Sequence, residues 1–190
     1  MAAPDPTFAR LVSLACHDLR TPLATVQGFA KTLLRMDLAE EQRERYLGLI
    51  DEASTELVGL TDRLALAARI EGGRYEPVLR EVDSLELARE ADPRSEGEGA
   101  PVRVDPEAVT RALADLVRAA ERHGDVEASV RVDGGRIQIA PVDEVAAPIV
   151  LGDDQKDLGA TVAARLLKAL GGAAAVEDGV LVVTLPNEAA

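Results

Sequence analysis

Two long stretches at the start of the chain place apolar residues at alternating steps of four and three. The first stretch has them at Phe8, Val12, Ala15, Leu19, Pro22, Val26, Phe29, Leu33 and Met36. The second has them at Tyr46, Ile50, Ala53, Leu57, Leu60, Leu64 and Ala67. This spacing is the a/d seam of helices that pack as in a coiled coil. The pattern predicts two long helices with a short connection, which together make an antiparallel hairpin.

The sequence also predicts where the second helix begins and ends. Asp37 followed by Glu40 is typical of an N-cap with its capping-box partner, and Gly72 and Gly73 are typical of a helix end. Further apolar residues beside the seams widen a stripe that two helices cannot cover alone. The pattern therefore predicts a homodimer in which two hairpins form a four-helix bundle. Burial of the same stripe by the C-terminal half of the chain is the alternative.

The pattern of apolar and polar residues changes after residue 73. Short β-like runs at 78–82, 102–104, 128–132, 137–140 and 180–185 alternate with helical patterns at 106–123 and 158–170. Asp-Gly pairs at 133–134 and 178–179 indicate hairpin turns, and the polar segment 92–100 is expected to be a loop. The predicted fold class is α+β: a helical hairpin over residues 1–73, then a small α/β sandwich with a largely antiparallel sheet over residues 74–190.

Composition limits the possible partners and surroundings of the protein. The formal net charge is −13, so nucleic-acid and anionic membrane surfaces are not expected as partners. The single cysteine, Cys16, excludes an internal disulfide framework and a cysteine-based zinc site. The sequence has no run of about 20 apolar residues and no signal-like N-terminus, so we expect a cytosolic protein.

The first helix carries a histidine on its outer side. If the seam positions are a and d, His17 falls at position f, which points away from the partner helix. Thr21 lies four residues later on the same face, and Pro22 sits in the helix interior, where proline costs about 3 kcal/mol. A proline one turn from an exposed histidine indicates a site whose geometry matters. A surface histidine without a role is the alternative.

Residues 16–23, Cys-His-Asp-Leu-Arg-Thr-Pro-Leu, resemble the phosphoacceptor motif of the sensor histidine kinases, and the resemblance continues along the hairpin to Glu71. It implies that His17 accepts a phosphoryl group on a ring nitrogen and exchanges it with an aspartate of a response-regulator receiver domain. It further implies that Asp18 orients and polarises the imidazole. Thr21 would position water for hydrolysis of the regulator's acyl phosphate, with Arg20 and Pro22 as supporting residues of the motif.

The C-terminal half resembles the Bergerat-type ATP-binding domain that follows this hairpin in the same family. Residues 113–124 resemble the asparagine-box helix, residues 157–165 resemble the second glycine box, and Leu185-Pro186 resembles the usual end of the domain. His123 closes the first of these helices, and we expect it to cap the helix or lie on the surface.

The residues that should hold nucleotide are nevertheless replaced. The magnesium-binding asparagine of the family corresponds to Ala119, and the two glycines of the adenine-binding motif correspond to Val145 and Ala147, although the aspartate of that motif matches Asp143. Asp157 replaces a glycine that approaches phosphate, and too few residues remain for the usual lid. Phosphoryl transfer from ATP depends on positioning and metal charge, so we expect ATP and magnesium binding to be lost and no other cofactor or metal to be held.

These features predict a dimeric histidine phosphotransfer protein of two-component signalling that relays phosphoryl groups between receiver domains. Three alternatives stay open at this point. The chain could be an autophosphorylating kinase with a distorted nucleotide site, a response-regulator phosphatase that uses Thr21, or a module that binds partners without catalysis.

Overall fold

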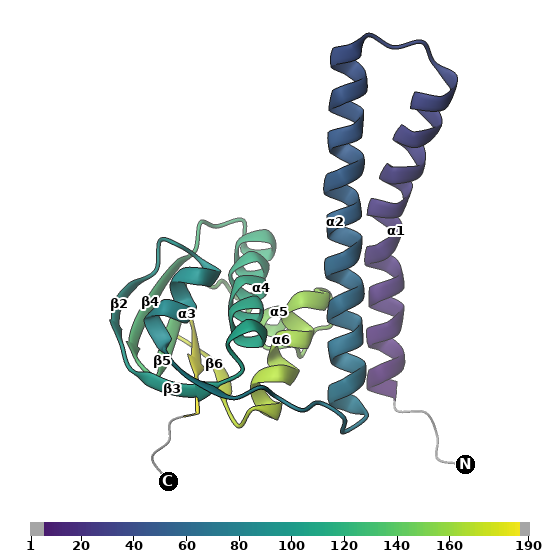
Figure 1. The fold of residues 1–190 in the computed structure, drawn as a ribbon. Helices are drawn as coiled ribbons and strands as arrows, with labels where there is room; N and C mark the ends of the chain where they lie inside the picture. Colours follow the sequence, from purple (N-terminus) through teal and green to yellow (C-terminus); the bar gives the residue numbers. More distant parts are fainter. Residues whose placement is uncertain (1–5, 187–190) are drawn as a thin grey trace, which may run out of the picture. The chain divides into compact units, whose positions relative to one another are not determined.

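The computed structural model describes residues 6–186 of the chain, which divide into two compact units, Met1–Ala65 and Leu66–Ala190. The first unit holds helix α1 (Pro6–Arg35) and most of helix α2 (Glu40–Glu71). The second unit begins in the last turns of α2 and contains all of the strands. The fold class is therefore α+β, with two long N-terminal helices followed by a small mixed sheet and its helices (Figure 1).

The first unit is the antiparallel hairpin that the apolar pattern predicts. Helix α1 continues through Pro22, and α1 and α2 lie side by side in Figure 1. Near the connection, the rings of Phe29 and Tyr46 pack with their centroids 4.9 Å apart. Ala15, Pro22, Ala53 and Leu60 of the two seams are buried. The side chain of Phe8 lies outside the described residues.

Most of the other seam residues are covered only in part. Leu19, Val26, Leu33 and Leu57 are half-buried, and Leu34 beside the seam is 85% exposed. A single hairpin therefore leaves much of its apolar stripe open.

The predicted start of the second helix is wrong by two residues. The helix begins at Glu40, and its first amides, from Gln42 and Arg43, donate to the carbonyl of Ala39. Ala39 therefore occupies the cap position that the sequence assigned to Asp37. Glu40 and Glu41 lie in the first turn, where negative charge favours the helix dipole without any capping box.

After the last turns of α2, the second unit has eleven elements within the described residues. Its strands are β1 (Arg80–Asp83), β2 (Glu96–Gly99), β3 (Pro101–Val104), β4 (Ser129–Gly134), β5 (Arg136–Ala140), β6 (Ala173–Glu177) and β7 (Val180–Thr184). Its helices are α3 (Ser84–Ala91), α4 (Pro106–Gly124), α5 (Ala147–Val150) and α6 (Leu158–Ala169). The five predicted strands and two predicted helices of this half are confirmed within a few residues.

The strands form two sheets. β1 pairs with β3 in a two-stranded antiparallel sheet, and the larger sheet has the order β2-β4-β5-β7-β6. In the larger sheet β2 runs parallel to β4, and the other neighbouring pairs are antiparallel. Hairpins join β4 to β5 and β6 to β7, as the Asp-Gly pairs predict. Asp178 and Gly179 both have positive φ, 49° and 78°, as a two-residue hairpin turn requires.

The core lies between this sheet and its helices. Val130, Val132, Ile137 and Ile139 alternate with more exposed residues and are buried, so one face of the sheet is covered. Helices α4 and α6 pack against each other, and each contributes a row of buried aliphatic side chains. Ala119 and Leu116 of α4 are fully buried in this layer.

The segment 92–100, expected to be a loop, contains strand β2 instead. Residues 96–99 read Glu-Gly-Glu-Gly, a composition with weak strand propensity. Pairing with β4 overrides it because glycine allows a very close approach: Gly97 has φ +122°, and a Cβ there would overlap the carbonyl oxygen of Val132. This strand is built by tertiary contact and not by local preference.

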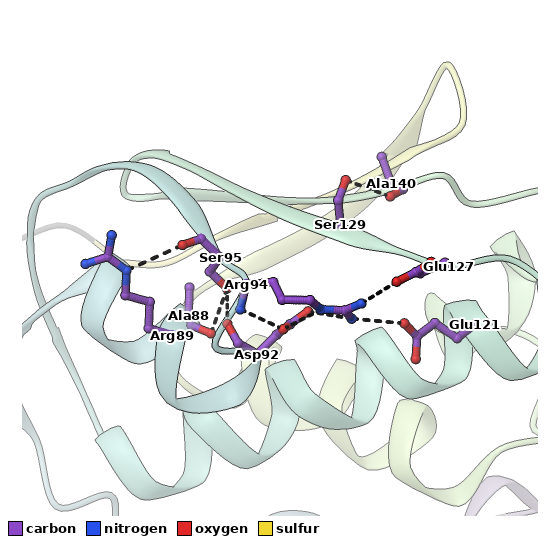
Figure 2. Close-up of polar contacts among 9 residues, drawn as sticks. All are labelled: Ala88, Arg89, Asp92, Arg94, Ser95, Glu121, Glu127, Ser129 and Ala140. Atoms are coloured by element: carbon purple, nitrogen blue, oxygen red, sulfur yellow. Dashed lines mark hydrogen bonds and ion pairs between the residues drawn. The ribbon is translucent and has the colours of Figure 1, made fainter.

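An arginine ties the start of this segment to its surroundings (Figure 2). Arg94 Nε and Nη2 lie 3.1 Å from Oδ1 and Oδ2 of the buried Asp92. The same guanidinium reaches Glu127 at 2.7 Å and Glu121, on α4, at 3.4 Å. The network therefore fixes the turn after α3 against the C-terminal end of α4.

Candidate functional site

His17 lies in the middle of α1 with its side chain 76% exposed, as position f predicts. Its Nδ1 is 3.2 Å from Oδ1 of Asp18, which is itself about three-quarters buried. A carboxylate at this nitrogen favours the tautomer with the proton on Nδ1 and leaves the lone pair of Nε2 available. Helical periodicity alone places neighbouring residues about 100° apart, so this contact depends on the side-chain conformations.

Arg20, Thr21 and Pro22 follow one turn later. Thr21 and Arg20 are exposed, and Pro22 is buried. Arg20 and Thr21 line an open groove of about 650 Å³ that runs along α1 past Ala24 and Gly28. The groove does not include His17 or Asp18, so the predicted residues form two adjacent groups on one helix: the imidazole with its carboxylate, and the groove.

The second unit places the carboxylate of Asp157 at the start of α6, against the end of α4. Asp157 is the N-cap of α6, with Oδ1 accepting the amide of Ala160 at 3.0 Å. Its Oδ2 lies 3.3 Å from Arg122 Nη1 and 3.2 Å from His123 Nε2, both at the end of α4. His123 is therefore tied to α6 and is neither a free surface residue nor the helix cap, since Asp125 takes the C-cap position.

Two further positions matter for the predicted loss of nucleotide binding, Ala119 and Asp143. Ala119 is fully buried and has only a methyl group where a magnesium ligand would be required. Asp143 Oδ1 accepts the amide of Ala146, the residue before the short helix α5, at 2.7 Å. Gln155 Oε1 is buried without a hydrogen-bond partner among the described residues, and as an acceptor it would attract a donor and not a phosphate oxygen. Ala119 therefore supplies no atom that could bind the magnesium of a nucleotide.

A family comparison decides the identity of the hairpin. Residues 9–73 match the His Kinase A (phospho-acceptor) domain. Sensor protein KdpD of Mycobacterium tuberculosis is 29% identical over 94% of this chain and 25% of its own length. The hairpin therefore matches the phospho-acceptor domain of histidine kinases. An uncharacterized sensor-like histidine kinase of Rhizobium meliloti is 32% identical over 37% of the chain, and that match covers 14% of its own length.

Solved structures that include histidine kinases share the fold of this chain. The histidine kinase AdeS of Acinetobacter baumannii superposes with a TM-score of 0.62 and 17% identity over 90% of this chain and 98% of AdeS. The histidine kinase ThkA, solved in complex with the response regulator protein TrrA, gives a TM-score of 0.54 and 18% identity over 93% of this chain and 60% of that one. A bacterial phosphotransferase gives 0.50 and 13% identity, with 98% of each chain covered.

The chain spans a quarter or less of the length of the curated relatives that it matches. Within residues 6–186, none of its helices combines the length and the apolar character needed to cross a bilayer. The contact of Asp157 with Arg122 and His123 is the feature that sequence reasoning missed. The residues are 34 and 35 positions apart, and no local pattern links them.

Proposed function

We propose that this chain is a cytosolic, dimeric histidine phosphotransfer protein that passes phosphoryl groups to and from response-regulator aspartates through His17. The observation that carries the proposal is the exposed imidazole of His17 with its Nδ1 held by Asp18. The position that would receive nucleotide phosphate in the second unit is taken by Asp157, which argues for transfer between proteins over transfer from ATP.

The proposed step is an in-line displacement at phosphorus. The Nε2 lone pair of His17 attacks the aspartyl phosphate of a receiver domain, the N–P bond forms, and the P–O bond to the aspartate breaks to leave a free carboxylate. The imidazole keeps its proton on Nδ1 and gains positive charge, which the carboxylate of Asp18 stabilises. The reverse step returns the phosphoryl group to another receiver, with no net change in protons.

Charge in the second unit supports the loss of ATP-dependent activity. The segment between α5 and α6 carries three carboxylates, those of Asp153, Asp154 and Asp157. Lys156 in the same segment forms an ion pair with Asp154 at 2.7 Å. A triphosphate would meet these carboxylates without the magnesium that normally neutralises its charge. We therefore propose that the unit binds neither ATP nor magnesium.

The hairpin supports a second copy and a receiver domain as partners. Its apolar seams are half-buried in one chain, and a second hairpin would cover them in a four-helix bundle. The related kinase ThkA was solved with a response regulator, which makes a receiver domain the natural partner class for His17.

A phosphatase activity is the second candidate. Thr21 is exposed one turn beyond His17 and lines the groove on α1, so its hydroxyl is accessible to a bound partner and to water. In this role Thr21 would speed hydrolysis of the receiver's acyl phosphate without being modified itself.

The test uses receiver domains labelled with radioactive acetyl phosphate. The unaltered protein is expected to take label on His17 as an acid-labile, base-stable phosphoramidate. His17→Ala abolishes labelling, whereas His123→Ala, which removes the only other histidine, leaves it intact. Asp18→Asn slows transfer by about 10²-fold if the carboxylate assists the imidazole.

Two further arms separate the candidates. Labelled ATP with magnesium and no receiver is expected to leave His17 unlabelled, and labelling would favour the kinase. Thr21→Ala is expected to retain transfer and to slow receiver dephosphorylation. A His17→Ala protein that still takes label from a receiver contradicts the proposal.

A further inference from the structure

The N-terminus of α6 has the surroundings of an anion. It belongs to a helix of twelve residues, whose first free amides carry partial positive charge. The last turn of α4 brings two further donors to the same point, the guanidinium of Arg122 and the imidazole of His123. Amides at a helix start together with an arginine and a histidine are the groups that bind phosphate or carboxylate.

Asp157 supplies the anion from within the chain. The two oxygens of its carboxylate have different partners. Oδ1 accepts a hydrogen bond from the amide of Ala160, and Oδ2 lies beside Arg122 and His123. Its side chain is only 9% exposed, and His123 beside it is 22% exposed. The hydrogen bond from the amide of Ala160 is all that an N-cap needs. The contacts with Arg122 and His123 therefore have a different role.

The two helices also meet without a gap next to this point. A Cβ at Gly159, in the first turn of α6, would lie 2.9 Å from Cγ of Asp115 on α4. The first turn of α6 is therefore pressed against α4, and the charged contact of Asp157 lies at the edge of a closed helix junction.

We propose that Asp157 is a built-in anion, placed where the resemblance to ATP-binding domains would put a nucleotide phosphate, and that it joins α6 to α4 through Arg122 and His123. This inference rests on the proposed loss of nucleotide binding and gives that loss a structural cause. In this chain the carboxylate links the two helices. Removal of the carboxylate exposes the donors again and makes them available to a free anion.

The test is chemical rescue of Asp157→Ala by inorganic phosphate. The variant is expected to melt about 3 to 6 °C below the unaltered protein because it loses a cap and a charged partner. Phosphate or sulfate at tens of millimolar is expected to recover at least half of that shift, compared with sodium chloride of equal ionic strength. The double variant Asp157→Ala/Arg122→Gln is expected to lose the recovery.

Asp83→Ala is the matched control. Asp83 caps α3 through the amides of Leu85 and Glu86, and neither contact involves a cation. Its loss should lower the melting temperature without any phosphate-specific recovery. Equal recovery of both variants, or no recovery of Asp157→Ala, overturns the proposal.

A second measurement applies if Asp157→Ala does not fold. Asp157→Asn keeps a cap oxygen but removes the charge, and a double-mutant cycle with His123→Gln is expected to be non-additive in melting temperature. Additive shifts overturn the proposal. Calorimetry of the unaltered protein with magnesium-ATP tests the proposed function separately, since binding there would refute the loss of the nucleotide site whatever the rescue shows.

Discussion

Asp92 and Arg94 of the second unit form an ion pair whose carboxylate is buried. Asp92 is buried, and its carboxylate receives two hydrogen bonds from the side chain of Arg94 (Figure 2). These hydrogen bonds hold the pKa of Asp92 below its ordinary value of 3.8, although burial acts in the opposite direction. A carboxyl group whose pKa is lower in the folded state stabilises the fold above its unfolded pKa, and this contribution is lost as the pH falls through the folded pKa.

Arg94→Leu is therefore expected to destabilise the protein most near neutral pH. The cost of the substitution should be constant above about pH 5. It should shrink as the pH falls below about 4, because Asp92 of the unfolded chain then binds a proton, and it should vanish once the pH has passed the lower pKa of the folded state. Urea unfolding midpoints of the two proteins at pH 7, 5, 4 and 3 measure this difference.

Arg43→Leu provides the comparison. Arg43 and Glu40 form an exposed pair at 4.0 Å on α2, and such pairs contribute little at any pH. If the Arg94→Leu difference stayed the same from pH 7 to pH 3, Asp92 would not be the group that Arg94 stabilises.

At the scale of elements, strand β2 depends on one glycine. Gly97→Ala is expected to detach β2 from β4, because the added methyl group would collide with the backbone of Val132 and because φ +122° is accessible only to glycine. We expect a loss of about 3 kcal/mol or more in unfolding free energy, with the amides of β2 losing their protection from hydrogen exchange.

Gly134→Ala is the control for backbone strain alone. Gly134 ends β4 with φ +59°, and no atom lies within 4 Å of a Cβ built there. Its substitution should cost about 1 kcal/mol. Equal effects of the two substitutions would mean that the close approach to Val132 is not what holds β2 in place.

The same elements show what the sequence can and cannot predict. Helices α4 and α6 and the hairpin turns follow from periodicity, caps and Asp-Gly pairs, which are local signals. Strand β2 has no such signal, since Gly97 is needed for the close approach to Val132, a residue of the neighbouring strand more than 30 positions away. At the candidate site, the residues of the motif around His17 are neighbours in the sequence, so the motif can be recognised from the sequence alone. The contacts of Asp157 with Arg122 and His123 form only when α4 packs against α6 and cannot be predicted in this way.

At the scale of the whole molecule, the open seams lead to a prediction about assembly. Light scattering is expected to give twice the 20.1 kDa of the chain, because a second hairpin would bury the half-exposed seam residues. Leu57→Glu places a charge on the seam and is expected to dissociate or unfold the dimer.

Val58→Glu is the neighbouring control. Val58 is 60% exposed and falls at heptad position b, outside the seam. It should leave the mass unchanged. A stable monomer of the unaltered chain would show that the seams are not a dimer interface.

The composition of strand β2 has a consequence for the behaviour of the sheet at high protein concentration. β2 and β6 are the two edges of the five-stranded sheet, and each edge leaves backbone groups free to pair with another chain. On β2 the exposed Glu96 and Glu98 place two negative charges along four residues, so two such edges repel each other. β6 has Ala173 and Ala175 exposed and a single glutamate at its end. Edge-to-edge pairing of sheets from different chains is therefore opposed by charge at β2. We expect crystal lattices or aggregates to extend the sheet at the alanine-rich edge strand β6.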